Sequence, residues 1–140
     1  WNGYTVTQVG LKSRGSQSRS PIKPSLGLDF SKYVKTQRFA GLKTLVLRNL
    51  NQDASMLHEF LAEKVFARLG LPYSREAFAK LFINGDYAGL YLMVEPIDAR
   101  FLQTRFADES GSLYDLQDVT YRFEYLGPAP ELYLPAIFDP

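Results

Sequence analysis

A β-hairpin sequence near the middle of the chain constrains the fold more than any other feature. Two apolar runs, residues 78–83 and 87–95, flank Asn84 and Gly85. Asn-Gly favours a two-residue type I′ turn, because both central positions need a positive φ that these residues tolerate best. The second run is almost wholly apolar, which predicts a central strand. The hairpin closes a unit of strand, helix and hairpin over residues 42–98, on which the rest of the fold is expected to be built.

The helix of this unit is predicted over residues 54–69. Asp53 stands where an N-cap belongs, Gly70 stands where a left-handed C-cap belongs, and Pro72 follows. A step of about 100° per residue places one apolar stripe toward the core. The stripe consists of Leu57, Leu61, Val65 and Leu69, widened by Ala62 and Phe66.

Three polar residues of this helix bear on function. His58 falls inside the stripe, where a lone histidine is more often a hydrogen-bonded core residue than a metal ligand. Glu59 falls at the edge of the stripe and is the better candidate to reach a lysine on the sheet. A plain surface charge is the alternative for Glu59. Glu63 points nearly opposite the stripe and is expected to be solvated.

The residues before the helix predict further strands. Residues 5–12 alternate apolar and polar in part, and residues 43–49 predict a strand buried on both faces. Residues 22–30 predict another strand, weakened at its start by Pro24. One face of that strand holds Ile22, Leu26, Leu28 and Phe30. These elements predict an α+β fold, an antiparallel twisted sheet with one main packed helix.

A small, polar and basic loop, residues 13–21, joins the first two predicted strands. The backbone N–H groups of such a loop can bind a phosphate, and Arg14, Arg19 and Lys23 would add positive charge. No P-loop or GxGxxG spacing is present. An ordinary solvated hairpin loop is the alternative.

The sequence beyond the hairpin predicts a break and then smaller elements. Pro96 interrupts the chain over residues 95–98, and Asp98 can cap a short helix. The inward side of that helix is expected to hold Phe101, Leu102 and Phe106. The expected elements are a helix over residues 99–106, strands at 113–114 and 121–126, and an irregular segment, 127–140, with four prolines.

Composition excludes several classes of function. The 140 residues make one domain or part of one, and 46% apolar residues suffice for a packed core. The net charge is +1 without a run of Lys or Arg, which gives no indication of nucleic-acid binding. Cysteine is absent and His58 is the single histidine, which disfavours sulfur-based zinc sites and histidine triads. No apolar run reaches membrane-spanning length.

The order of these segments resembles the CotH kinase family, whose members are treated as atypical protein kinases. The resemblance spans about residues 9–114 and rests on order and spacing. The matching segments are VGLKSRGS (9–16), Lys23, LGLDF (26–30), QRFAGLK (37–43), LVLRN (45–49), QDASMLHE (52–59), LGLP (69–72), INGDYAGLYLMVE (83–95), DARFL (98–102) and GSLY (111–114).

The resemblance implies an ATP-dependent phosphotransferase whose N-terminal lobe is a sheet with one helix. Lys23 would contact the phosphates, and Glu59 would orient it, as in the lysine–glutamate pair of protein kinases. Arg14 or Lys12 could fill the role of Lys23. Residues 1–95 would form the lobe, and 96–140 the hinge and the start of the next lobe. The implied cofactor-binding residues are Arg14, Gly15, Ser16, Ser18 and Lys23 at the phosphates, and Glu95 and Ile97 at the adenine.

The resemblance also implies magnesium, a protein substrate, and a secreted or cell-surface location. The acidic metal ligands of the family belong to a C-terminal lobe, and Asp115, Asp118 and Asp139 match none of its motifs. The chain, which starts at Trp1, is therefore expected to be a piece of a longer protein and inactive alone. Two alternatives remain: a non-catalytic adhesion or coat module with the same fold, and an unrelated α+β domain whose loop binds nothing.

Overall fold

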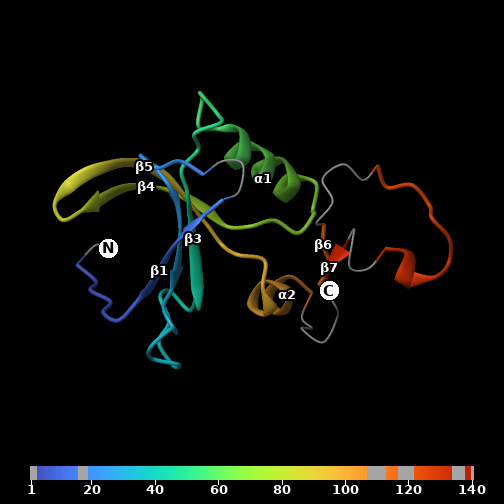
Figure 1. Ribbon diagram of the computed structural model, residues 1–140, viewed down its shortest axis with the longest axis horizontal. Coiled ribbons are helices and arrows are strands. Elements are labelled where there is room, and N and C mark those ends of the chain that lie inside the picture. The colour runs from blue at the N-terminus through green and yellow to red at the C-terminus, as the bar shows by residue number, and fades with distance from the viewer. Residues whose placement is uncertain (1–2, 16–18, 107–112, 117–121, 134–137, 140) are drawn as a thin grey trace. The chain divides into compact units, whose positions relative to one another are not determined.

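The computed structural model describes residues 3–15, 19–106, 113–116, 122–133 and 138–139 (Figure 1). The chain divides into two compact units, Trp1–Ala107 and Asp108–Pro140. The first unit holds a sheet and two α-helices. The fold class is therefore α+β, as the sequence predicted.

An antiparallel sheet of five strands forms the centre of the first unit. Its strand order is β1-β2-β3-β5-β4, so β5 is an inner strand with neighbours on both sides. The strands are β1 (Gly10–Arg14), β2 (Ser25–Asp29), β3 (Thr44–Arg48), β4 (Glu76–Ile83) and β5 (Asp86–Val94). The nearly apolar sequence of β5 follows from this position between β3 and β4.

The first two strands are shorter than predicted. β1 begins at Gly10 rather than at residue 5, because Gln8 adopts a φ of 56° that interrupts the extended backbone. β2 begins after Pro24, which cannot donate to a ladder. Ile22 precedes the strand and is exposed rather than buried.

The two faces of the sheet carry different cores. One face, here called the Tyr91 face, buries Leu26, Phe30, Leu45, Leu47 and Tyr91. The other, here called the Arg48 face, buries Leu50, Leu92 and Val94 against Val46, Met56, Phe60 and Phe78. This division follows from the alternation of side chains along β3 and β5.

Helix α1 (His58–Arg68) covers the Arg48 face. It starts four residues later than predicted, because Met56 has a left-handed φ of 57°. Asp53 still caps it, since Asp53 Oδ2 accepts the His58 N–H at 2.8 Å. At the other end Gly70 has a φ of 73°, and the Leu71 N–H donates to the Phe66 carbonyl at 3.0 Å, as in a Schellman motif.

The predicted inward stripe of α1 points outward. Its apolar members, with Phe66, are all exposed, and no residue of α1 is fully buried. The half-buried residues on the sheet side are Met56, Glu59, Phe60, Glu63 and Ala67. His58 is likewise exposed rather than a core residue, with its Nδ1 2.9 Å from Asp53 Oδ1.

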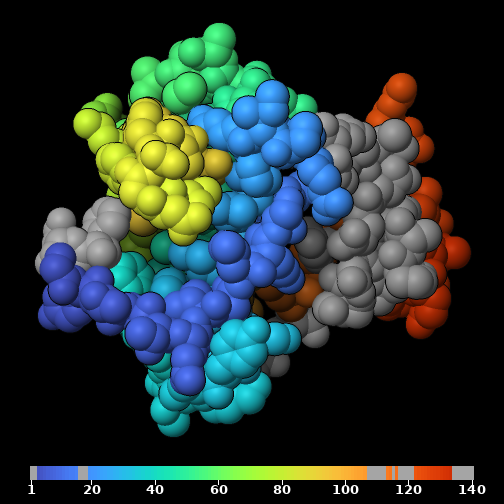
Figure 2. Space-filling model, turned by 60° about the vertical axis from the view of Figure 1, so that its left-hand side comes forward, coloured from blue at the N-terminus to red at the C-terminus, as the bar shows by residue number. Residues whose placement is uncertain are grey.

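The β4–β5 hairpin has the turn that the sequence predicted. Asn84 and Gly85 have φ values of 52° and 94°, and the register shifts between Leu81 and Phe82. The hairpin tip lies open on the surface, in yellow in Figure 2. Phe82 and Tyr87 pack together there, with their ring centroids 5.4 Å apart.

Helix α2 (Ala99–Phe106) has the predicted bounds. Asp98 Oδ1 accepts the Phe101 N–H at 3.2 Å, which confirms the predicted cap. Phe101 is buried, whereas Phe106 is exposed, contrary to the prediction.

The second unit contains a short antiparallel pair, β6 (Asp115–Leu116) and β7 (Phe138–Asp139), and a 3-10 helix, η1 (Pro130–Leu132). The predicted strand over 121–126 is not formed in its described residues, 122–126. The two elements after Gly127 lie in a segment predicted to be irregular. Across the described parts of both units, no helix has the length and apolar character needed to span a bilayer.

Candidate functional site

An ion pair joins α1 to the sheet on the Arg48 face. Arg48, the last residue of β3, places its Nε 2.6 Å from Glu59 Oε1. Partial burial and the neighbouring Glu63 raise the pKa of Glu59, and together they outweigh the opposite effect of Arg48. Glu59 therefore reaches the sheet, but its partner is Arg48 of β3 and not the lysine that was predicted.

A polar pocket of ≈ 360 Å³ adjoins this ion pair. Lys12, Arg14 and Arg48 supply three cations to its lining, which also holds Ser13, Gly15, Ser25 and Val46. No acidic side chain lines it among the described residues. Such a concentration of cations beside serines and a glycine suits an anionic group such as a phosphate.

Gly27 determines where the Arg14 side chain lies. A Cβ on Gly27 would stand 2.8 Å from Arg14 Nε and 3.2 Å from its Cδ. The absence of a side chain on β2 thus lets Arg14 lie across the strand beside Val46. Since the obstructed atoms belong to a flexible side chain, an alanine here would displace Arg14 without disturbing the backbone.

A second polar pocket of ≈ 320 Å³ lies at the N-terminal end of α1. It shares Ser25 and Arg48 with the first pocket and is also lined by Asp53, His58 and Glu59. Hydrogen bonds from Ser55 and from the His58 backbone lower the pKa of Asp53 to about 2. Arg48 and Glu59 therefore stand between a cationic pocket and one that also carries carboxylates.

Lys23 lies on the opposite face from Glu59. Its ammonium donates to the Asn49 carbonyl at 2.8 Å and stands 5.1 Å from the centre of the Tyr91 ring. Burial lowers the pKa of Lys23. The predicted Lys23–Glu59 contact is not formed, because the sheet separates the two side chains.

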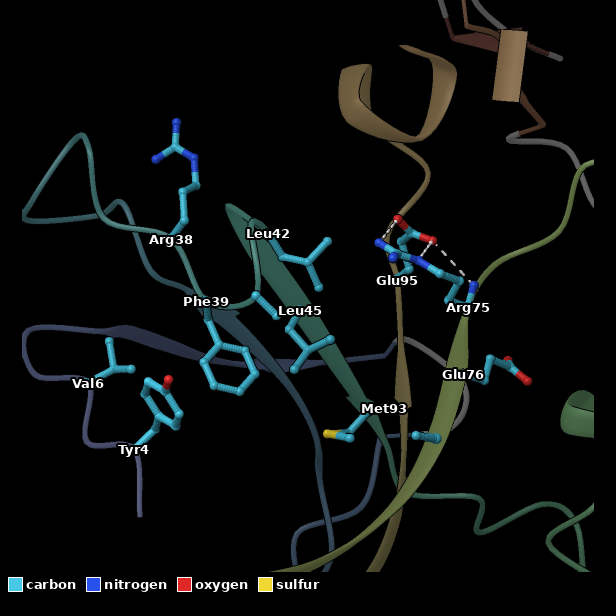
Figure 3. Close-up of a pocket in the computed structure, with 12 residues that line it drawn as sticks. Tyr4, Val6, Arg38, Phe39, Leu42, Leu45, Arg75, Glu76, Met93 and Glu95 are labelled. Carbon is cyan, nitrogen blue, oxygen red and sulfur yellow. Dashed lines mark hydrogen bonds and ion pairs between the residues drawn. The ribbon is translucent and has the colours of Figure 1, made fainter. Parts of the chain in front are cut away.

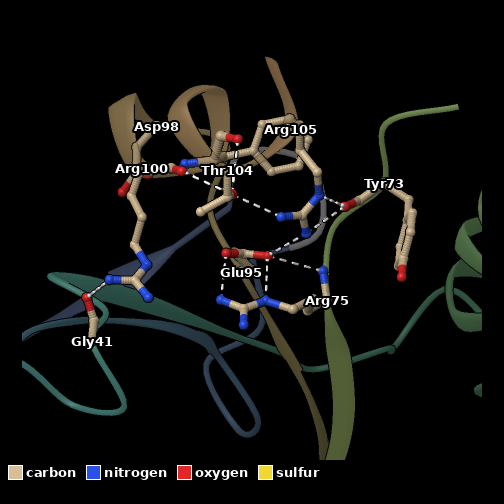
Figure 4. A network of polar contacts seen from close by, with 9 residues as sticks. Gly41, Tyr73, Arg75, Glu95, Asp98, Arg100, Thr104 and Arg105 are labelled. Carbon is tan, nitrogen blue, oxygen red and sulfur yellow. Dashed lines mark hydrogen bonds and ion pairs between the residues drawn. The ribbon is translucent and has the colours of Figure 1, made fainter. Parts of the chain in front are cut away.

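Glu95 follows β5 at the predicted hinge, where its carboxylate forms ion pairs with two arginines (Figure 4). Arg75 donates to its two oxygens at 2.8 and 2.7 Å, and Arg105 of α2 donates at 3.0 Å. Burial alone would raise the pKa of Glu95, but these arginines outweigh burial and lower it. The Glu95 N–H also donates to the Arg75 carbonyl at 3.0 Å. Ile97, the other predicted adenine contact, is exposed.

Glu76, at the start of β4, also has a buried carboxylate, but its surroundings are the opposite of those of Glu95. Neither of its carboxylate oxygens has a hydrogen-bond partner among the described residues. Burial first, and then the charges of Glu59 and Glu63, raise the pKa of Glu76 to about 7. Glu63 is itself half-buried and accepts the Ser74 N–H at 2.8 Å, so it is not solvated as predicted.

A pocket of ≈ 650 Å³ opens on the Tyr91 face (Figure 3). Its lining is mainly apolar and includes Tyr4, Phe39, Leu42, Leu45 and Met93. Arg75 and Glu95 stand together at one end and bind each other. Arg38 and Glu76 also line it, so this pocket carries charged groups of both signs, unlike the cationic pocket beside Arg48.

The structure brings only part of the predicted site together. Arg14 and Gly15 line the cationic pocket, Lys23 and Glu95 lie elsewhere, and Ser16 and Ser18 fall outside the described residues. Arg48 was missed, although its place in Leu45-Val46-Leu47-Arg48 puts it on the face opposite the two leucines. Among the described residues, no group of three acidic, histidine or cysteine side chains could hold a metal ion.

The fold and the site are those of an α+β domain with a strand-to-helix ion pair beside a cationic pocket. Residues 11–133 match the family described as CotH kinase protein, and the chain belongs to that family. It is similar to the inner spore coat protein H of Bacillus subtilis (strain 168), with 26% identity over 110 residues. The match covers 79% of this chain and 30% of that protein, so the chain spans about a third of its relative's length.

Proposed function

We propose that this chain is the nucleotide-binding lobe of a CotH-like atypical protein kinase that uses ATP to phosphorylate secreted or coat proteins. The observation that carries the proposal is the Arg48–Glu59 pair beside the cationic pocket. Protein kinases use a lysine on the third strand, paired with a glutamate of the following helix, to hold the nucleotide phosphates. Arg48 and Glu59 occupy the same kinds of element.

In this proposal the basic residue at the phosphates is Arg48 rather than Lys23. Arg14, held across Gly27, and Lys12 add positive charge from β1. A guanidinium suits this place because it binds a phosphate bidentately and keeps its charge. Glu59 fixes the direction of the Arg48 side chain, and Val46 lies beside the pocket as an apolar surface for the base.

Magnesium is part of the proposed reaction, but the described residues do not fit it. They contain no cluster of carboxylates suited to the ion. Positioning and metal charge contribute most of the catalysis in phosphoryl transfer. We therefore expect the 140-residue chain to bind the nucleotide without transferring phosphate to an acceptor.

Nucleotide binding is tested by thermal unfolding of the chain with and without ATP. Saturation at ten times the dissociation constant should stabilise the fold by about 1.4 kcal/mol. Arg48→Ala and Gly27→Ala should reduce this stabilisation strongly, and Glu59→Gln should reduce it in part. Arg68→Ala, which removes an exposed cation of α1 outside the pocket, is the matched control. An unchanged response in Arg48→Ala, or no response to ATP in the parent chain, would contradict the proposal.

A second candidate is a non-catalytic module that assembles with a coat or cell surface. The exposed Phe82–Tyr87 pair at the hairpin tip favours it, since it places two aromatic rings at a projecting surface. The similar protein in B. subtilis is named as a spore coat protein. Saturable binding to coat material, lost in Tyr87→Ser and accompanied by no response to ATP, would favour this function.

A further inference from the structure

The outward side of α1 carries an apolar ridge. Leu57, Leu61, Val65 and Leu69, here called the α1 ridge, have between 43% and 68% of their surface exposed. They follow one another at intervals of four residues, so they form one continuous ridge that is inclined to the helix axis. Phe66 and Leu71 extend the exposed apolar surface beside it.

The charges beside the ridge have one sign along the body of the helix. Lys64 and Arg68, both exposed and four residues apart, follow one side of it. The two glutamates of α1 turn to the sheet instead. Glu59 pairs with Arg48, and Glu63 accepts the Ser74 N–H. A partner that lies along the ridge therefore meets apolar side chains and cations, and no carboxylate of the helix.

We infer that the α1 ridge is the docking surface for an amphipathic helix of a partner protein, with Asp or Glu bordering its own apolar stripe. A row of side chains at four-residue intervals packs into the groove between the corresponding rows of another helix. Carboxylates on the partner would complement Lys64 and Arg68, which selects that partner over equally apolar helices.

Two other occupants match this surface less well. A second copy of the chain would present the same apolar ridge and the same cations, so Lys64 and Arg68 would lack carboxylates from the facing ridge. An anionic membrane would supply negative charge, but an interfacial helix that binds lipid has a strongly charged polar face, whereas the remaining side of α1 packs on the sheet.

The inference is tested with two synthetic helical peptides of about 18 residues, long enough for helix formation. Both carry leucines at four-residue intervals, bordered by Glu in one peptide and by Lys in the other. Fluorescence anisotropy with the 140-residue chain should show at least about tenfold tighter binding of the Glu peptide. The double variant Lys64→Glu, Arg68→Glu should reverse this preference, and Val65→Glu should weaken both peptides.

The matched control is the double variant Lys35→Glu, Lys43→Glu, which changes the net charge equally at exposed positions away from α1. It should keep the preference for the Glu peptide, and circular dichroism should show the same fold in all variants. Equal binding of the two peptides, or a preference that follows the control charges, would overturn the inference. So would self-association in sedimentation that Val65→Glu abolishes, or binding confined to phosphatidylserine vesicles. ATP enters none of these measurements, so their outcome is independent of the proposed nucleotide site.

Discussion

Glu76 begins β4 and Glu95 directly follows β5, the neighbouring strand, yet the surroundings of the two carboxylates are opposite. Glu76 pairs in register with Val94, the residue before Glu95. Glu95 receives hydrogen bonds from Arg75 and Arg105, whereas both oxygens of Glu76 lack a partner among the described residues. The pKa of Glu95 is lowered and that of Glu76 is raised to about 7.

This difference separates a region whose buried carboxylate is fully hydrogen-bonded from one whose buried carboxylate has no hydrogen-bond partner among the described residues. At Glu95 the cost of burying a charge is offset by fully paired donors, which join β4, β5 and α2. Beneath α1, Arg48 pairs with Glu59, and the charges of Glu59 and Glu63 raise the pKa of Glu76 by more than Arg48 and Lys64 lower it. Local conflicts of this kind occur at functional sites, and the proposed nucleotide pair lies in this second region.

The largest effect on stability is expected for Glu95→Ala. The variant removes the partner of Arg105, which is largely buried, and of Arg75, which is half exposed. Breaking such a pair leaves a cation without compensation, and we expect a loss of about 3 kcal/mol in the free energy of unfolding, measured with urea. Asp86→Asn, at an exposed position, is the control. A loss below that of the control would show that the Glu95 network contributes little.

A smaller effect of the opposite sign is expected for Glu76→Gln. Because the folded-state pKa lies above the ordinary value of 4.5, the parent chain should lose stability as the pH rises from about 4.5 to 7. Glutamine cannot ionise, so the variant should be more stable than the parent above pH 7, by about 1 to 2 kcal/mol after screening.

This prediction is measured as unfolding free energy between pH 4 and 8. Below pH 4.5 the parent and the variant should converge, because Glu76 is then protonated in both folded and unfolded chains. His58→Asn, which removes the single histidine of the chain, is the control. A parallel pH dependence in parent and Glu76→Gln would place the titration elsewhere.

The smallest effect is expected for Arg48→Gln. Arg48 is 53% exposed and Glu59 is 30% exposed, so solvent screens their attraction. We expect a cost under about 1 kcal/mol, reduced further in 1 M NaCl. Arg75→Gln, which breaks the bidentate pair with Glu95, should cost more under the same conditions. Equal costs would remove the distinction between the two regions.

Local features of the fold could be predicted from the sequence. Asn84-Gly85 specifies its turn within two residues, and Asp98 fixes the start of α2 through its own hydrogen bond. The existence of α1 followed from Asp53, Gly70 and the apolar period. In each case, the residues that determine the structure are neighbours in sequence.

The orientation of α1 could not be obtained in that way. The period of the helix identifies an apolar side, but contacts distant in sequence decide which side faces the sheet. Phe60 packs on Phe78 of β4 with ring centroids 5.2 Å apart, and Glu59 meets Arg48 of β3. The same limit explains Lys23, whose side of the sheet depends on a contact with Asn49, 26 residues away.

The irregularity between Leu81 and Phe82 has a consequence for solubility. β4 is an edge strand of the sheet, and its outer backbone groups could pair with another chain. The register shift twists the end of this edge, and the exposed Lys80 adds a charge just before it. The extra residue of this irregularity is Ala88 of β5, which has no partner in the register. A hairpin without it would give β4 a longer, flatter edge for intermolecular strand pairing, the first step toward aggregation.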